Sequence, residues 1–199
     1  MLGVDETIVQ QFEEKWQSNA GKLLHINHRE ELEDLILDLS AADAFKEKPI
    51  VVGGSLGQWE WIRTWNPEKV SIWSPGDDPE VFRHQCANAS LGITGCAWAA
   101  ADAGSVCLYS QKDSSLLPSL LPPIHVVLIA KDQIVLSFHE GMGKLYQDAH
   151  DQGLWPSLVK IVAGPSMTAD IEGQLILGVH GPRDIYAVII DDSIGIQPN

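Results

Sequence analysis

Side chains that can accept or transfer a proton gather in one stretch near the C-terminus, GPSMTADIEGQLILGVHGPR (164–183). Such a set could hold an anionic small molecule and move a proton, with Glu172 as base and His180 as acid or anion ligand. The same groups can equally form a structural network of helix caps. The ligand-binding candidates of this stretch are Gly164, Ser166, Thr168 and Asp170.

The predicted strand LVKIVA (158–163) positions this stretch, because it runs directly into the turn at Gly164. After the turn, Ser166 or Thr168 is predicted to cap a helix by accepting a backbone N–H group. The two carboxylates would then lie in the first helical turn, where unpaired N–H groups and the helix dipole stabilise negative charge. Further on, the glycines and the proline of LGVHGP (177–182) predict an irregular loop around the imidazole.

Two more glycine-bearing segments follow predicted strands. The buried strand PIVV (49–52) leads into GGSLG (53–57), which lacks the lysine of a P-loop, so a plain strand-to-helix turn explains it as well. TG (94–95), at the end of GITG (92–95), is expected to form a turn before an alanine-rich segment, which is expected to form a short helix ahead of the AGS turn (103–105). The candidates added here are Gly53, Gly54, Ser55, Thr94, Gly95, Gly104 and Ser105 for ligand binding, and Asp102 as an alternative base.

These loops are expected to meet. Strand ends of one kind share one edge of a parallel sheet, so the two segments and the C-terminal stretch should converge on one crevice.

The alternation of predicted strands and helices defines the fold. Residues 1–45 predict two amphipathic helices around KLLHI, which is either a strand or an extended link. Further strands are expected at 69–73, 105–109, 124–130, 158–163 and 185–191, with helices over 78–90 and 137–153. The pattern predicts a single three-layer α/β domain over residues 1–199, with a mostly parallel sheet and the N-terminal helical segment packed on it.

Composition excludes several classes of function. The net charge of −14 and the pI near 4.7 repel phosphate backbones and anionic membranes, so no nucleic-acid binding is expected. The N-terminus carries acids where a signal peptide needs bases, and the apolar runs are too short for a membrane span, so a cytoplasmic protein is expected. Cys86, Cys96 and Cys107 include no CxxC pair and are expected to be buried thiols rather than disulfide, metal or cluster ligands.

The motifs GPSMTADIE (164–172) and LGVHGP (177–182) resemble the signature of the LUD-domain family. GITG, ADAGSVCL (101–108) and LLPPIHVVLIA (120–130) stand upstream in the order that the family has. The resemblance implies the NagB/RpiA/CoA-transferase-like fold. It also implies a role in lactate utilization, as a subunit that acts with separate iron–sulfur partner proteins in the oxidation of L-lactate to pyruvate. The iron–sulfur clusters would sit on those partners, with no cofactor on this chain.

The related folds leave an alternative open. The chain could be a stand-alone enzyme of the phosphosugar isomerase or acyl/CoA transferase kind, or a carboxylate-binding module that uses the same crevice. An enzyme of this kind would need a basic group for phosphate or a well-placed glutamate for acyl transfer. Asp102 stands where the family usually has a glutamate, and its side chain is one methylene shorter.

Overall fold

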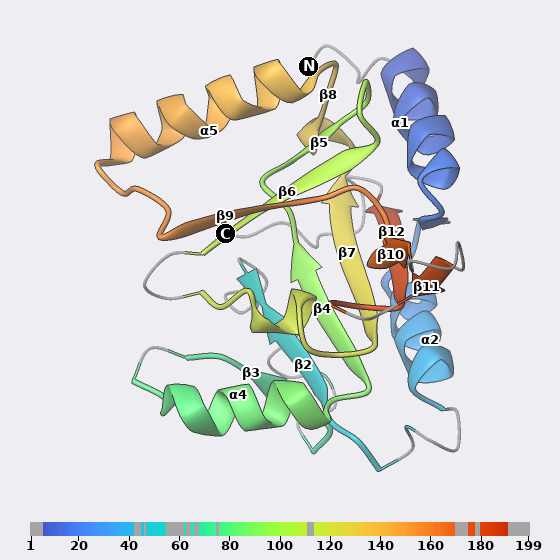
Figure 1. Cartoon of the computed structure of the whole chain (residues 1–199), viewed down its shortest axis with the longest axis vertical. Helices are drawn as coiled ribbons and strands as arrows, with labels where there is room; N and C mark the ends of the chain where they lie inside the picture. The colour runs from blue at the N-terminus through green and yellow to red at the C-terminus, as the bar shows by residue number, and fades with distance from the viewer. Residues whose placement is uncertain are drawn as a thin grey trace.

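The computed structural model describes residues 6–41, 45, 47–54, 62, 65, 68–74, 76–110, 114–169, 175–177 and 180–190. A six-stranded, all-parallel sheet forms the centre, in the spatial order β1-β12-β7-β4-β2-β3 (Figure 1). The predicted α/β fold with a mainly parallel sheet is therefore confirmed. The strands of this sheet are β1 (Lys22–Ile26), β2 (Ile50–Gly53), β3 (Val70–Ile72), β4 (Leu91–Gly95), β7 (Ile124–Ala130) and β12 (Asp184–Ile190).

Helices pack on both faces of the parallel sheet, which gives the three layers. Side chains alternate along β7, so Leu128 packs in the same apolar cluster as α2 (Arg29–Ser40), whereas Ile129 packs in the cluster that contains α1 (Glu6–Ser18). Both clusters are fully buried at their centres. Burial of both faces explains why β7 is a nearly continuous apolar run. KLLHI is strand β1, which pairs with β12.

The helix α4 (Pro79–Asn88) covers the end of the sheet formed by β2 and β3. It lies on the same face of the sheet as α1. Phe82 packs with Val51, whereas Ile50 and Val52, the neighbours of Val51 along β2, point to the opposite face, where α2 lies. Asp78 caps this helix by accepting a hydrogen bond from the Glu80 N–H group at 2.9 Å. Proline at the first helical position needs no N–H partner, as the sequence predicted.

A second, four-stranded sheet covers the parallel sheet on the α1 side. Its order is β8-β5-β6-β9, with β6 antiparallel to both of its neighbours. The prediction that β6 and β9 belong to the mainly parallel sheet is wrong. Periodicity identifies a strand but not its partner, because pairing is decided by contacts far along the chain. The strands are β5 (Trp98–Ala100), β6 (Ser105–Ser110), β8 (Ile134–Val135) and β9 (Leu158–Val162).

The alanine-rich segment is strand β5 rather than the predicted helix. Ala99 and Ala100 are fully buried, and they pair with β6 on one side and β8 on the other. Their small side chains suit the tight space between layers, so packing overrides the helix propensity of alanine. GITG forms the last four residues of β4, so Thr94 and Gly95, predicted as a turn, belong to the end of this strand. There Gly92 lies under the short 3-10 helix η2 (Leu117–Ser119), where a Cβ atom would overlap the Pro118 carbonyl oxygen.

The helix α5 (Phe138–Gln152) packs on the outer face of the second sheet (Figure 1). Ser137 caps it by accepting a hydrogen bond from the Glu140 N–H group at 3.2 Å, and Gly153 ends it in the left-handed conformation at φ 65°. The predicted helix over 137–153 is confirmed. No helix in the described part of the chain is long and apolar enough to cross a membrane.

In the described residues that follow Gly164, a hairpin stands where a helix was predicted. Strand β10 (Met167–Ala169) pairs antiparallel with β11 (Leu175–Leu177). The Ser166 N–H group donates to the Pro182 carbonyl at 3.1 Å, which holds the two arms together just before the hairpin. The backbone groups of β10 are therefore paired across the hairpin, and the Ser166 hydroxyl accepts a hydrogen bond from the His180 N–H group rather than from a helix.

Candidate functional site

The order of strands places a crevice between β2 and β4. After β2 the chain moves outward to β3, and β4 then returns to the other side of β2, so the direction of winding reverses at this point. Ligands of α/β proteins bind at such reversals, beyond the carboxyl ends of the strands. A pocket of about 350 Å³ lies there, with Gly54 and Gly95 in its wall. Gly54 has a φ of 65°, a conformation that favours glycine.

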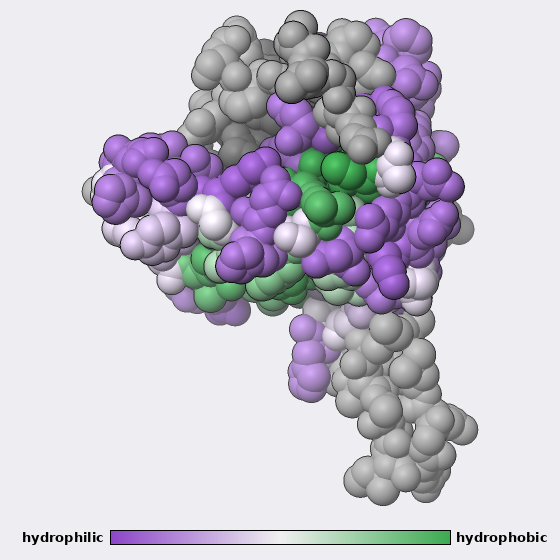
Figure 2. Space-filling model, turned by 90° about the horizontal axis from the view of Figure 1, so that it is seen from above, coloured by the Kyte–Doolittle hydropathy of each residue, from purple (hydrophilic) through white to green (hydrophobic). Residues whose placement is uncertain are grey.

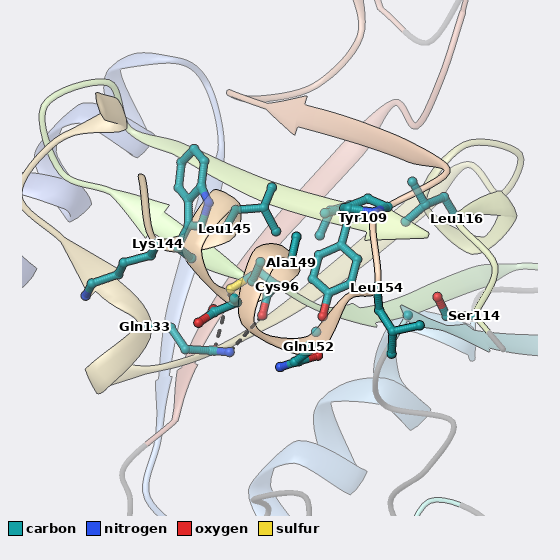
Figure 3. Close-up of a pocket in the computed structure, with 17 residues that line it drawn as sticks. Cys96, Tyr109, Ser114, Leu116, Gln133, Lys144, Leu145, Ala149, Gln152 and Leu154 are labelled. Carbon is teal, nitrogen blue, oxygen red and sulfur yellow. Dashed lines mark hydrogen bonds between the residues drawn. The ribbon is translucent and has the colours of Figure 1, made fainter. Parts of the chain in front are cut away.

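The pocket lies under the C-terminal half of α5 (Figure 3). Polar and apolar groups contribute about equally to its wall. The Tyr109 ring and Gln152 face the middle of the group, whereas the Lys144 amine points away from it. The apolar lining residues are Trp98, Leu108, Leu116, Leu145, Ala149, Leu154 and Pro156.

A glutamine fixes the geometry of the pocket. Gln133 ends the 3-10 turn η3 (Lys131–Gln133), and its amide nitrogen donates to the Cys96 carbonyl at 2.7 Å (Figure 3). Its amide oxygen accepts a hydrogen bond from the Ala130 N–H group at 2.9 Å. Both strand ends, that of β4 and that of β7, are therefore tied to one side chain. Gln133 positions the wall and has little capacity left for a ligand.

The charge of the pocket comes from α5. Lys144, Asp148 and Gln152 line it at intervals of four residues, which places them on one face of the helix. Lys144 lies 3.5 Å from Glu140 on the same helix, on the outer side. With its amine turned outward, the pocket offers an anion no inward cation among the described residues.

One polar atom of the wall has no partner. The indole nitrogen of Trp98 is buried and makes no hydrogen bond among the described residues. Because this nitrogen has almost no accessible surface, a ligand in the pocket would not reach it in this arrangement of the wall.

A buried polar cluster lies next to Gly54 in the pocket wall. Thr94, which adjoins Gly54, shares a 2.8 Å hydrogen bond with His125 Nε2, and both residues are fully buried. From β9, the Lys160 amine donates to Ser119, to the carbonyl at 2.6 Å and to the hydroxyl at 3.2 Å. Burial, and secondly the charge of Lys160, lower the pKa of His125 to about 3, so the imidazole is neutral at physiological pH. Burial lowers the pKa of Lys160 to about 8.

Only part of the expected convergence is seen. Gly53, Gly54, Thr94 and Gly95 lie together at the switch point, as predicted. Gly104 and Gly164 instead pack against the end of α1, both with positive φ. Asn19 joins these two loops, because its amide donates to the carbonyls of Ala103 and Gly104, and its own carbonyl oxygen abuts Gly164.

The candidate base Asp102 lies beside α5. Its carboxylate accepts a hydrogen bond from the Phe138 N–H group at 3.0 Å, and its own N–H group donates to Leu136. Asp102 thus helps to cap the helix, which favours the structural alternative that the sequence left open. The neighbouring Ser105 is buried, and its hydroxyl has no hydrogen-bond partner among the described residues.

Two of the C-terminal candidates, Ser166 and His180, are in contact. The Ser166 hydroxyl accepts a hydrogen bond from the His180 N–H group at 3.3 Å, and the His180 side chain is exposed. Thr168 stands in β10, opposite Ile176. Ser55, Asp170 and Glu172 lie outside the described residues.

The cysteines are free and buried, as expected. Burial raises the pKa of Cys86 and of Cys107 to about 12, and raises the pKa of Cys96 as well. Among the described residues, no three His, Cys, Asp or Glu side chains are grouped as metal ligands would be.

Sequence reasoning missed most of the pocket wall. The polar face of α5 had a readable signal, because Lys144, Asp148 and Gln152 recur at helical spacing beside the apolar Leu145 and Ala149. Gln133 and Tyr109 had none, since their place in the wall depends on which strands pair.

Comparison with known proteins gives a consistent result. The sequence model of the family described as LUD domain matches residues 9–190. The chain is 32% identical over 131 residues to the lactate utilization protein C of Bacillus licheniformis, covering 64% of this chain and 54% of that protein. It is 35% identical over 121 residues to the protein of the same name from Macrococcus caseolyticus, covering 61% and 52%. An uncharacterized protein, YkgG of Escherichia coli, is 32% identical over 121 residues, with the same coverage of 61% and 52%.

The matches therefore span about half the length of these curated relatives. Among solved structures, a DUF162 family protein from Deinococcus radiodurans is similar with a TM-score of 0.63, at 20% identity, covering 93% of this chain and 97% of that one. This likeness concerns the fold.

Proposed function

Because the chain belongs to the LUD-domain family, we propose that it works in lactate utilization, as a subunit that acts with separate iron–sulfur proteins in the oxidation of L-lactate to pyruvate. The observation that carries this proposal is the similarity, at 30–35% identity over more than 60% of the chain, to several proteins named lactate utilization protein C.

The chemistry of the cysteines supports placing the clusters on the partners. Cluster ligands are thiolates. The three thiols of this chain are buried, and burial raises their pKa values, which disfavours the thiolate. In this proposal the electrons pass through the partners, and the chain contributes binding or assembly.

The pocket at the switch point supports a second role, the binding of a small molecule. Its position at the switch point and its volume of about 350 Å³ favour this role. A phosphosugar or a coenzyme A thioester is less well supported, because Lys144 points outward and phosphate groups need inward donors. Catalysis by Asp102, Glu172 or His180 stays a proposal, for which His180→Ala is the simplest probe.

Growth on lactate tests the main proposal. A strain that lacks its own copy of this protein should grow on glucose but not on L-lactate, and the gene for this chain should restore both growth and lactate-dependent pyruvate formation in extracts. Unimpaired growth of the deletion strain on L-lactate, with normal lactate oxidation, would refute it. His180→Ala separates binding from catalysis, since a purely assembling subunit should tolerate the change.

A further inference from the structure

The exposed hydrophobic residues of this protein are unevenly distributed. Of the twelve large hydrophobic residues that are strongly exposed in the described part, six lie within residues 146–161. The view from above is mainly hydrophilic, with a limited apolar area near its centre (Figure 2). We call the six the β9 surface: Tyr146, Leu154, Trp155, Leu158, Val159 and Ile161.

These residues form one surface around the edge of the second sheet. Val159 and Ile161 lie opposite Tyr109 and Cys107 of β6, so they are on the face that α5 covers. However, α5 packs on β5 and β8 at the far side of the sheet, which leaves the two side chains 37% and 39% exposed. Trp155 follows the end of α5, and its ring meets the ring of Tyr146 on α5 edge to face, with centroids 5.3 Å apart.

In the described part of the chain, the outer edge of β9 is unpaired and carries no outward charge. Strand β9 pairs only with β6 among the described strands. Proteins usually guard such an edge with an outward charge or a proline. The one charged residue of β9, Lys160, instead turns inward to Ser119. Residues 153–169 contain no acid at all, in a chain whose net charge is −14.

We propose that β9 is a docking strand, to which an iron–sulfur partner protein adds an extended apolar segment flanked by neutral or basic residues. Strand addition would pair the free backbone groups of β9, while the apolar side chains of the segment cover the β9 surface. Basic flanks suit the acidic remainder of this chain. The inference rests on the proposed function, because that proposal supplies the partner.

A second copy of the chain fits this edge less well. In a two-fold pairing of β9 with itself, Lys160 lies at the centre of the strand, so it would stand opposite its own copy. Like charges placed directly opposite each other destabilise a sheet. Two chains that each carry −14 also repel at longer range. A heterologous partner avoids both terms.

Binding of the purified iron–sulfur proteins of the same lactate-oxidising system tests the inference, with bound iron as the readout. Val159→Glu and Ile161→Glu should each weaken binding roughly tenfold or more, because a buried carboxylate would face apolar groups. Val81→Glu is the matched control, since this valine is also exposed but lies on α4. Trp155→Ser provides a variant outside the strand, in case a change in β9 disturbs folding, and thermal midpoints verify that each variant is folded.

Each outcome decides a different question. Loss of binding in the surface variants alone, with slower amide exchange of β9 in the complex, supports docking. Unchanged binding in those variants overturns the docking strand and leaves the proposed function standing. A wild-type chain that binds no iron–sulfur protein overturns both. If the chain self-associates and Val159→Glu abolishes this, the choice of partner is overturned. If the β9 amides that do not face β6 are already protected from exchange in the free chain, the chain covers its own edge and the docking strand is overturned.

Discussion

The inward-turned Lys160 makes a specific prediction about alkaline stability. Burial between the two sheets lowers the pKa of this lysine from 10.5 to about 8, while its amine donates two hydrogen bonds to Ser119. Between pH 8 and 10.5 the unfolded chain therefore binds more protons at this site than the folded chain. The free energy of unfolding rises with pH wherever that is so.

The magnitude follows from the size of the shift. Each pH unit within this window contributes about 1.4 kcal/mol, so the whole window contributes about 3 kcal/mol to the stability of the wild type. Lys160→Met cannot release a proton and gains nothing over the same range. The difference in unfolding free energy between wild type and variant should thus move by about 3 kcal/mol in favour of the wild type. At pH 7 the difference should be small, because loss of the buried charge offsets loss of the hydrogen bonds.

Urea unfolding of both proteins at pH 7, 8, 9 and 10 measures this change. Other groups that titrate in alkali affect both proteins alike and cancel in the comparison. Lys15→Met is the control, because Lys15 is exposed on α1 and its removal should leave the pH profile parallel to that of the wild type. Parallel profiles for Lys160→Met as well would show that the amine is solvated, and would refute the reasoning.

Three further predictions concern named contacts. Gly92→Ala should destabilise the fold by about 3 kcal/mol, because the new Cβ overlaps a backbone oxygen of η2. Gly143→Ala has open space in α5 and should stabilise the fold by about 0.5–1 kcal/mol. Thermal midpoints equal to that of the wild type would contradict both. His125 stays neutral in the folded state down to about pH 3, so stability should fall as pH drops below 6.5, and His125→Asn should lose about 3 kcal/mol less than the wild type between pH 6.5 and 4 in urea unfolding. Asp102→Ala should cost about 1 kcal/mol of stability, because the Phe138 N–H group loses its acceptor. Asp102→Asn should keep lactate-dependent growth, because its amide oxygen still accepts that hydrogen bond. Loss of growth with a stable Asp102→Asn protein would instead support Asp102 as a general base.

Local signals in the sequence predicted local structure well. The ends of α5 were readable from Ser137 and Gly153, because capping depends on a few neighbouring residues. The apolar run of β7 correctly indicated burial on both faces. Such features are encoded within about ten residues of chain.

Features that depend on distant partners could not be predicted in the same way. The alanines of β5 form a strand because β6 and β8 flank them, and no neighbouring residue signals this pairing. The glycine at position 164 indicated a turn. The backbone N–H group of Ser166, however, donates to the Pro182 carbonyl at the start of a hairpin, and no sequence signal near Ser166 indicates that partner. For the same reason the sequence identified Gly54 and Gly95 in the pocket wall, but not the parts of the wall that α5 and Gln133 form.

The position of β12 bears on how the chain folds as it is synthesised. This strand is the last of the parallel sheet in sequence, yet it lies between β7 and β1, the first strand. The N-terminal unit of α1, β1 and α2 therefore has no strand to pair with until residue 190 has left the ribosome. Until then the edges of β1 and β7 that β12 covers stay unpaired. Long-range closure of this kind slows folding and leaves nascent chains open to chaperones and to aggregation.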